Sequence, residues 1–210
     1  MGSTLSSDLL CLATYSERGS ANNSNGAIDN PTNYLFAGGV DGRIHRWTIS
    51  ISHGNKKCSN AGVMAAHNGR VNAMAVCSDM NVLVSVGNDG CVHCTLLMDD
   101  SDPSGWGKTS LNLNGDGIVR KITSLCIIHE ESNRAIVAIG TSCGQISLVE
   151  MNKSEDNVLQ VSFLKDGNRI GLDDGEGSVI HALCSKQHDI FCRIMIGHSA
   201  GLSVWDLSLQ

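Results

Sequence analysis

The amino-acid sequence predicts an all-β protein made of several small antiparallel sheets. Short runs of Val, Ile, Leu, Ala and Cys alternate with Gly, Asn, Asp and Ser, and helix-forming residues do not cluster. The chain has 23 glycines but only 2 prolines, which suits many tight turns between strands. A strand–turn–strand pattern also recurs four times, and this repeat organises the whole chain.

Each copy of the repeat is an apolar strand, a tight turn and a second strand. The four copies occupy 34–50, 82–97, 135–151 and 191–207. Their turns end at Gly42, Gly90, Gly144 and Ala200, at intervals of 48, 54 and 56 residues. Repeats of about 40–55 residues that each hold three or four antiparallel strands are typical of propeller blades.

Further apolar runs supply the remaining strands of each unit. A strand is expected before each copy, at 9–15, 71–77, 122–128 and 180–186. A small residue recurs at one position of these strands: Cys11, Ala73, Ser124 and Ala182. A fourth strand is expected after the first three copies, at 62–66, 110–114 and 158–164.

These strands predict four blades, at approximately 8–66, 67–114, 118–165 and 176–210. A small sheet cannot bury both of its faces alone, so neighbouring blades must stack on one another. The polar, Gly/Asn/Ser-rich segment 16–32 is expected to be a mobile loop within the first blade.

The second unit, HNGRVNAMAVCSDMNVLVSVGNDGCVHCTLL, resembles a WD repeat. His67 lies four residues before Val71, and Ser85 and Asp89 match the family's strand Ser and turn Asp. The fourth unit ends in VWDLS, with the WD dipeptide at Trp205–Asp206. The first unit has Trp47 and Asp41 at the corresponding places.

The family's hydrogen-bonded Trp–Ser–His–Asp set is incomplete in every unit. The departures are Ala37 for Ser, Thr95 and Val149 for Trp, and Cys143 and Ser199 for Asp. Each missing partner removes a hydrogen bond worth a net ~1 kcal/mol. The resemblance therefore implies divergent blades held mainly by apolar packing.

The resemblance also implies a role. Members of the family are non-catalytic scaffolds or adaptor subunits that bind other proteins in intracellular complexes, and transfer from fold to role is analogy. Seven blades are usual in the family, and only seven residues precede the first blade here. We therefore expect the C-terminal part of a larger propeller, or an open ring completed by another segment or chain. A self-closed four-blade ring and an enzyme that uses a propeller channel are alternatives.

Several patterns suggest chemistry, and each is better explained by structure. Cys91 and Cys94 of CVHC have the spacing of a zinc pair, but positions three apart in a strand point to opposite faces. The segments 112–117 and 166–177 resemble calcium loops without the twelfth-position Glu. The GKT of 104–110 lacks the upstream glycine of a P-loop. His67, Ser85 and Asp89 could be mistaken for a catalytic triad, but no nucleophile elbow accompanies them. From these patterns together we expect no catalytic residues, no metal and no cofactor.

Candidate contacts with a partner protein come from loops. Trp106 lies in the polar segment DDSDPSGWGK, where it has little core to join. The loops that lead into first strands and those between second and third strands share one rim of a propeller. That rim is expected to carry His67, Asn68, Arg70, Arg120, Lys121, Asp173 and Asp174.

The bulk properties limit the class of partner. No Lys/Arg run occurs and the formal net charge is -6, so nucleic acid is not an expected partner. No apolar run is long enough to span a membrane. The nine cysteines are an odd number, which favours reduced thiols in the cytoplasm or nucleus.

Overall fold

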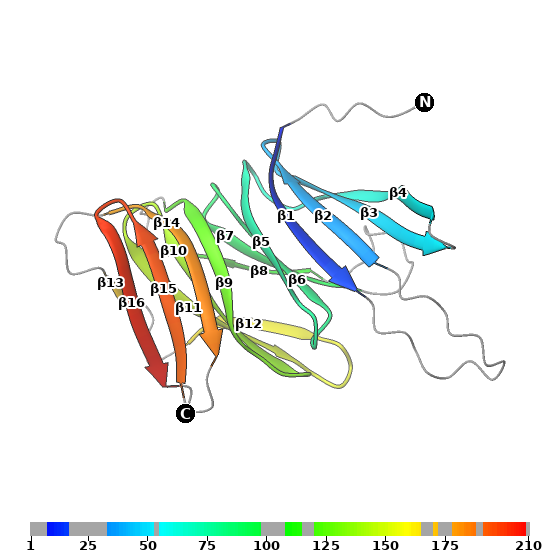
Figure 1. The fold of residues 1–210 in the computed structure, drawn as a ribbon. Helices are drawn as coiled ribbons and strands as arrows, with labels where there is room; N and C mark the ends of the chain where they lie inside the picture. Colours follow the sequence, from blue (N-terminus) through cyan, green and yellow to red (C-terminus); the bar gives the residue numbers. More distant parts are fainter. Residues whose placement is uncertain are drawn as a thin grey trace.

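The computed structural model describes residues 8–16, 33–52, 55–97, 108–114, 120–164, 170–171, 178–187 and 191–208. Within these ranges the chain is all β, in four antiparallel sheets (Figure 1). We call the sheets blades 1 to 4. No helix that could span a membrane occurs in the described ranges.

Each blade is a meander, in which strands that follow one another in the sequence pair antiparallel. Blade 1 contains β1 (Leu9–Ser16), β2 (Asn33–Gly39), β3 (Arg43–Ser52) and β4 (Asn55–Ala65). Blade 2 contains β5 (Val71–Cys77), β6 (Val82–Gly87), β7 (Cys91–Leu96) and β8 (Lys108–Asn112). Blade 3 contains β9 (Ile122–Glu130), β10 (Arg134–Thr141), β11 (Gln145–Lys153), β12 (Leu159–Phe163) and the short β13 (Ile170–Gly171). Blade 4 contains β14 (Ile180–Gln187), β15 (Phe191–His198) and β16 (Gly201–Ser208).

The blades stack in chain order as an open array. First strands lie side by side, with β1 against β5, β5 against β9 and β9 against β14. Blades 1 and 4 lie at opposite ends, and no comparable packing joins their described strands (Figure 1). The expected stacking of propeller blades is therefore present, and the four blades do not close into a ring by themselves.

Apolar clusters fill the three junctions between neighbouring blades. Phe36, Ile44 and Met64 of blade 1 pack with Val71 and Leu83 of blade 2. The second junction holds the largest cluster, and the third buries blade 3 residues against blade 4. The burial of the second strands reflects this arrangement. Every residue of β6 is buried, whereas in β15 buried and exposed residues alternate because only one face is covered.

The turns between second and third strands depend on glycine in three blades. Gly42, Gly90 and Gly144 have φ of 79°, 72° and 78°, the left-handed region that closes a three-residue hairpin loop. The fourth turn also ends at Ala200, as expected, but it is one residue shorter than the other three. The fourth loop contains only Ser199 and Ala200, because His198 already pairs with Gly201, and the positive φ of 143° falls on Gly201.

Two strands differ from the expected pattern. β4 begins at Asn55 rather than at 62, because its first half, 56–60, is polar and exposed and carries no apolar signal. The two-residue β13 pairs with β11 and was not predicted. The strands of each blade otherwise lie inside the predicted blade ranges.

Candidate functional site

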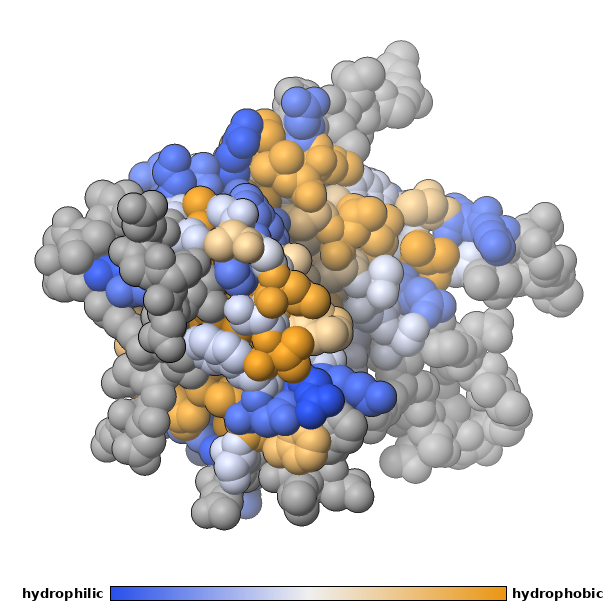
Figure 2. All heavy atoms as spheres, turned by 60° about the vertical axis from the view of Figure 1, so that its left-hand side comes forward, coloured by the Kyte–Doolittle hydropathy of each residue, from blue (hydrophilic) through white to orange (hydrophobic). Residues whose placement is uncertain are grey.

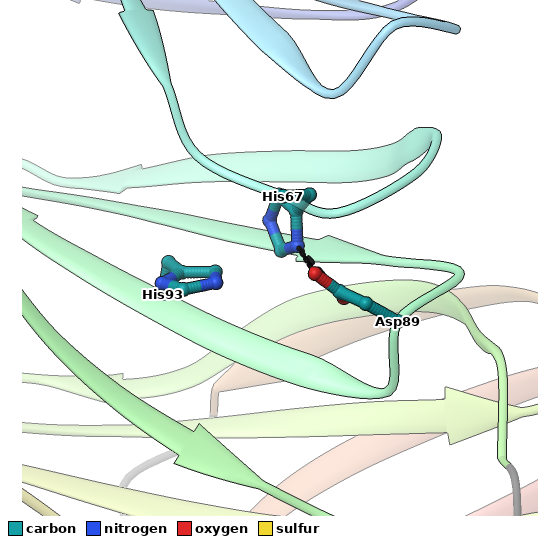
Figure 3. A group of neighbouring side chains, drawn as sticks. All are labelled: His67, Asp89 and His93. Carbon is teal, nitrogen blue, oxygen red and sulfur yellow. Dashed lines mark hydrogen bonds and ion pairs between the residues drawn. The ribbon is translucent and has the colours of Figure 1, made fainter.

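The most extensive side-chain network of the rim joins His67, Ser85 and Asp89 of blade 2. His67 Nδ1 lies 3.0 Å from Asp89 Oδ1 (Figure 3), and His67 Nε2 lies 3.0 Å from Ser85 Oγ. A carboxylate can only accept, so His67 donates from Nδ1, and in a neutral imidazole its Nε2 then accepts the Ser85 hydroxyl. The His67 side chain is fully buried, so this network fixes the loop that links blade 1 to blade 2.

The local sequence explains why these groups meet. Asp89 is the middle residue of the three-residue turn, and its carboxylate accepts from the backbone N–H of Asn68 at 2.8 Å and of Cys91 at 3.1 Å. Gly87 leaves room for the imidazole, since a Cβ at this position would lie 2.7 Å from His67 Nδ1. Asp89 therefore joins a turn of blade 2 to the loop that enters the same blade.

The electrostatics agree with this structural role. Burial alone would raise the pKa of Asp89, but the hydrogen bonds from His67, Asn68 and Cys91 hold it below the ordinary 3.8. The His93 ring meets His67 edge to face at 4.5 Å, and burial, together with His67, lowers the pKa of His93. The site thus favours an ionised Asp89 carboxylate and a neutral His93 imidazole.

Donor atoms of His67, Asp89 and His93 lie within 4.8 Å of one another, close enough to share a metal ion (Figure 3). Both nitrogens of His67 are already engaged, by Asp89 and by Ser85. A metal ion would have to replace the His67–Asp89 hydrogen bond, so this arrangement suits a structural hydrogen-bond network better than a metal centre. Cys94 lies in the blade 2–blade 3 core, where burial raises its pKa to about 12, and Cys91 lies on the other face of β7.

The equivalent positions in the other blades are only partly filled. Asp41 accepts from Arg43 N at 3.1 Å as Asp89 does from Cys91, but no described His reaches it. Trp47 stacks on His45 at 5.7 Å on the open face of blade 1. In blade 4, Trp205 packs toward blade 3 while Asp206 forms an exposed pair with Arg193 at 2.7 Å.

A small hollow lies where blade 2 has Thr95 in place of the family's Trp. Its volume is 240 Å³, and it is lined by Ala65, Ala66, His93, Thr95, Lys108, Thr109 and Ser110. Thr95 occupies the register position that Trp47 and Trp205 occupy in blades 1 and 4. The sequence signal for this hollow was the missing Trp, whose loss of volume was not taken into account.

One backbone hydrogen bond repeats at the rim of all four blades. The first residue of each turn donates its N–H to the carbonyl just before the first strand: Val40 to Asp8, Asn88 to Arg70, Ser142 to Lys121, and Ser199 to Val179. Arg70 and Lys121 are therefore equivalent residues of neighbouring blades, and both are exposed. Asn68 is exposed on the same rim.

Other predicted contact residues lie elsewhere. His67 is buried, and Arg120 is only 3% exposed, with its guanidinium donating to Gln145 Oε1 and the Leu113 carbonyl. The expectation that these two side chains offer surface to a partner is corrected by their burial, because both stabilise the loops from within. Trp106, Asp173 and Asp174 lie outside the described residues.

Comparison with known proteins supports the fold. No family model matches the sequence, and no curated protein matches it significantly. Among solved structures, the chain is similar to Sqt1 of Saccharomyces cerevisiae, with a TM-score of 0.59 and 13% identity over 95% of this chain. Sqt1 is a WD-repeat propeller protein, so the likeness shows that the four sheets have the fold of propeller blades. The chain spans 45% of the length of Sqt1.

Proposed function

We propose that this chain is a non-catalytic scaffold that binds another protein through the rim formed by blades 2 and 3. The observation that carries the proposal is the placement of Arg70 and Lys121 at one repeated position of adjacent blades. Two exposed cations held on neighbouring rigid loops can pair with carboxylates of one partner segment. The partner proposed is therefore an acidic stretch of a protein, such as a peptide rich in Asp and Glu.

The loops beneath these cations are held in place before any partner arrives. The side chain of Asn72 donates to Asn88 Oδ1 at 2.7 Å and to the Ile122 carbonyl at 2.6 Å, which ties the loops of blades 2 and 3 together. The backbone bonds from Asn88 to Arg70 and from Ser142 to Lys121 add to this. A preorganised rim loses little conformational entropy on binding, which favours recognition.

The compartment is part of the same proposal. All nine cysteines are free thiols, and Cys58 and Cys184 are exposed. Exposed thiols persist in the reducing environment of the cytoplasm or nucleus. These features support an intracellular scaffold and leave the choice between the two compartments open.

The test is cross-linking mass spectrometry on the tagged chain isolated from cells, comparing charge-reversed variants. Arg70→Glu with Lys121→Glu should reduce recovery of the cross-linked partner about tenfold or more and weaken its salt dependence. Lys57→Glu is the matched control, since Lys57 is exposed on β4 at the end away from the rim. Equal loss in both variants, or no loss in the first, would refute the proposed binding surface.

A further inference from the structure

The two end faces of the array are open and apolar. On blade 4, Met195, Leu202 and Val204 are exposed on the face that points away from blade 3. On blade 1, Leu9, Leu12 and Val63 are exposed on the face that points away from blade 2. Figure 2 brings the blade 4 side forward and shows apolar side chains gathered at the surface.

The three junctions inside the chain show what covers such faces. The first residue of each first strand, followed by a β-bulge, is an apolar side chain directed at the preceding blade. These residues, Val71, Ile122 and Ile180, are fully buried. The equivalent residue of blade 1 is Leu9, which also precedes a bulge. Leu9 is 40% exposed because no blade lies behind it.

The preceding blade receives this side chain next to a glycine in two junctions. A Cβ on Gly38 would lie 2.6 Å from Val71 Cγ1, and a Cβ on Gly140 would overlap Ile180. Gly197 occupies the same register position in blade 4, opposite Ala182. A Cβ there would meet nothing nearer than Ala182 Cβ at 3.7 Å. Among the described residues, blade 4 thus leaves space beside Gly197, and we call this space the notch.

A side-chain hydrogen bond accompanies each internal junction. The carbonyl of the inserted residue accepts from the preceding blade: Val71 O from Cys11 Sγ, Ile122 O from Asn72 Nδ2, and Ile180 O from Thr123 Oγ1. In blade 4 the position of Asn72 and Thr123 is held by His181, which is exposed. His181 Nε2 contacts Ser199 Oγ at 3.2 Å, as Asn72 contacts Asn88. Blade 4 therefore also carries the side chain that would complete a fourth junction.

We propose that a second copy of this chain covers both ends, with Leu9 of each copy seated beside Gly197 of the other. In the part of the chain that the structure describes, the notch beside Gly197 is unfilled and Leu9 is exposed. Two copies can therefore complete each other as a ring of eight blades with two-fold symmetry. A head-to-tail contact closes into a ring when its rotation permits. One copy corresponds to 45% of the propeller protein Sqt1, so two copies approach the length of one such protein. The ends and the rim are separate surfaces, so this inference is independent of the proposed function.

The experiment is light scattering after size exclusion of the purified chain over a wide concentration range. A mass of about 45 kDa, twice 22.3 kDa, is expected, and a monomer at all concentrations would overturn the proposal. Species that grow steadily with concentration would overturn the closed ring. The exposed thiol of Cys184 lies on the face of blade 4 that the second copy would cover. It should therefore react with a maleimide more slowly in the dimer than in the monomer.

Two variants test the junction, and one serves as control. Leu9→Glu removes the inserted side chain at an exposed site. Gly197→Val places a side chain in the notch, and its Cβ would approach its own blade no closer than 3.7 Å, at Ala182 Cβ. Each should weaken association tenfold or more and speed the labelling of Cys184. Val158→Glu is the control, because Val158 is 56% exposed on the turn before β12 and should leave the dimer intact. A Leu9→Glu chain that remains dimeric would show that blade 4 faces pair with each other, which overturns the assignment.

Discussion

Replacing Asp89 with alanine tests whether the rim network stabilises the fold. Asp89 accepts from the fully buried His67 side chain and from the backbone N–H groups of Asn68 and Cys91. Hydrogen bonds to a charged group contribute about 1.5–3 kcal/mol, and a buried imidazole left without its acceptor adds a desolvation cost. We expect Asp89→Ala to lower the free energy of unfolding by about 3 kcal/mol.

Asp41 provides a matched control within the same chain. It makes the same turn bond, from Arg43 N at 3.1 Å, and a loose, exposed pair with Arg43 Nε at 3.9 Å. Asp41→Ala should therefore cost only about 0.5–1 kcal/mol. Urea unfolding followed by far-ultraviolet circular dichroism at a fixed protein concentration measures both variants. Equal losses in the two variants would refute the claim that His67 makes the difference.

Four further predictions concern the pH dependence of stability, the glycines between blades and the reactivity of the cysteines. Burial, together with His67, lowers the pKa of His93, so as the pH falls this histidine is protonated in the unfolded chain before it is protonated in the folded chain. The free energy of unfolding should therefore begin to fall below pH about 6.5. His93→Gln should remove this part of the pH dependence, measured by urea unfolding at several pH values. The pKa of Asp89 lies below 3.8, so its contribution to the free energy of unfolding is complete above pH about 4 and is lost as the pH falls further. If an Asp89→Asn variant lost as much stability as the unmodified chain over this pH range, the loss would not come from Asp89. Gly140→Ala should cost about 2 kcal/mol in urea by overlapping Ile180, whereas Gly197→Ala should be neutral within about 0.5 kcal/mol. Mass spectrometry after brief thiol labelling should find Cys58 modified and the buried Cys77 and Cys94 protected. Rapid labelling of Cys94 would contradict the buried position of β7.

The repeat made most of the fold predictable. Turn glycines at Gly42, Gly90 and Gly144 and the apolar runs around them located three hairpins, because only glycine readily adopts their φ. The fourth hairpin lies where it was expected, but its loop is one residue shorter, so the positive φ falls on Gly201, just after the turn. The polar first half of β4 was missed because an exposed outer strand has no apolar face to display.

The site was predictable only where side chains repeat. The resemblance located His67, Ser85 and Asp89, and the structure brings all three together. Arg120 was expected at the surface because its loop lies on the rim, but its guanidinium donates to Gln145 and to the Leu113 carbonyl in the interior. The role of Gly38, Gly140 and Gly197 depends on contacts between blades, which no single repeat contains.

The most direct test of the account mixes the two variants that each lack one half of the junction. The Leu9→Glu chain keeps the notch at Gly197, and the Gly197→Val chain keeps Leu9. Each alone should have a mass near 22.3 kDa, and an equimolar mixture should contain a species of about 45 kDa joined by one intact junction. A mixture that remains monomeric while the unmodified chain is dimeric would contradict the head-to-tail stacking of blades between copies.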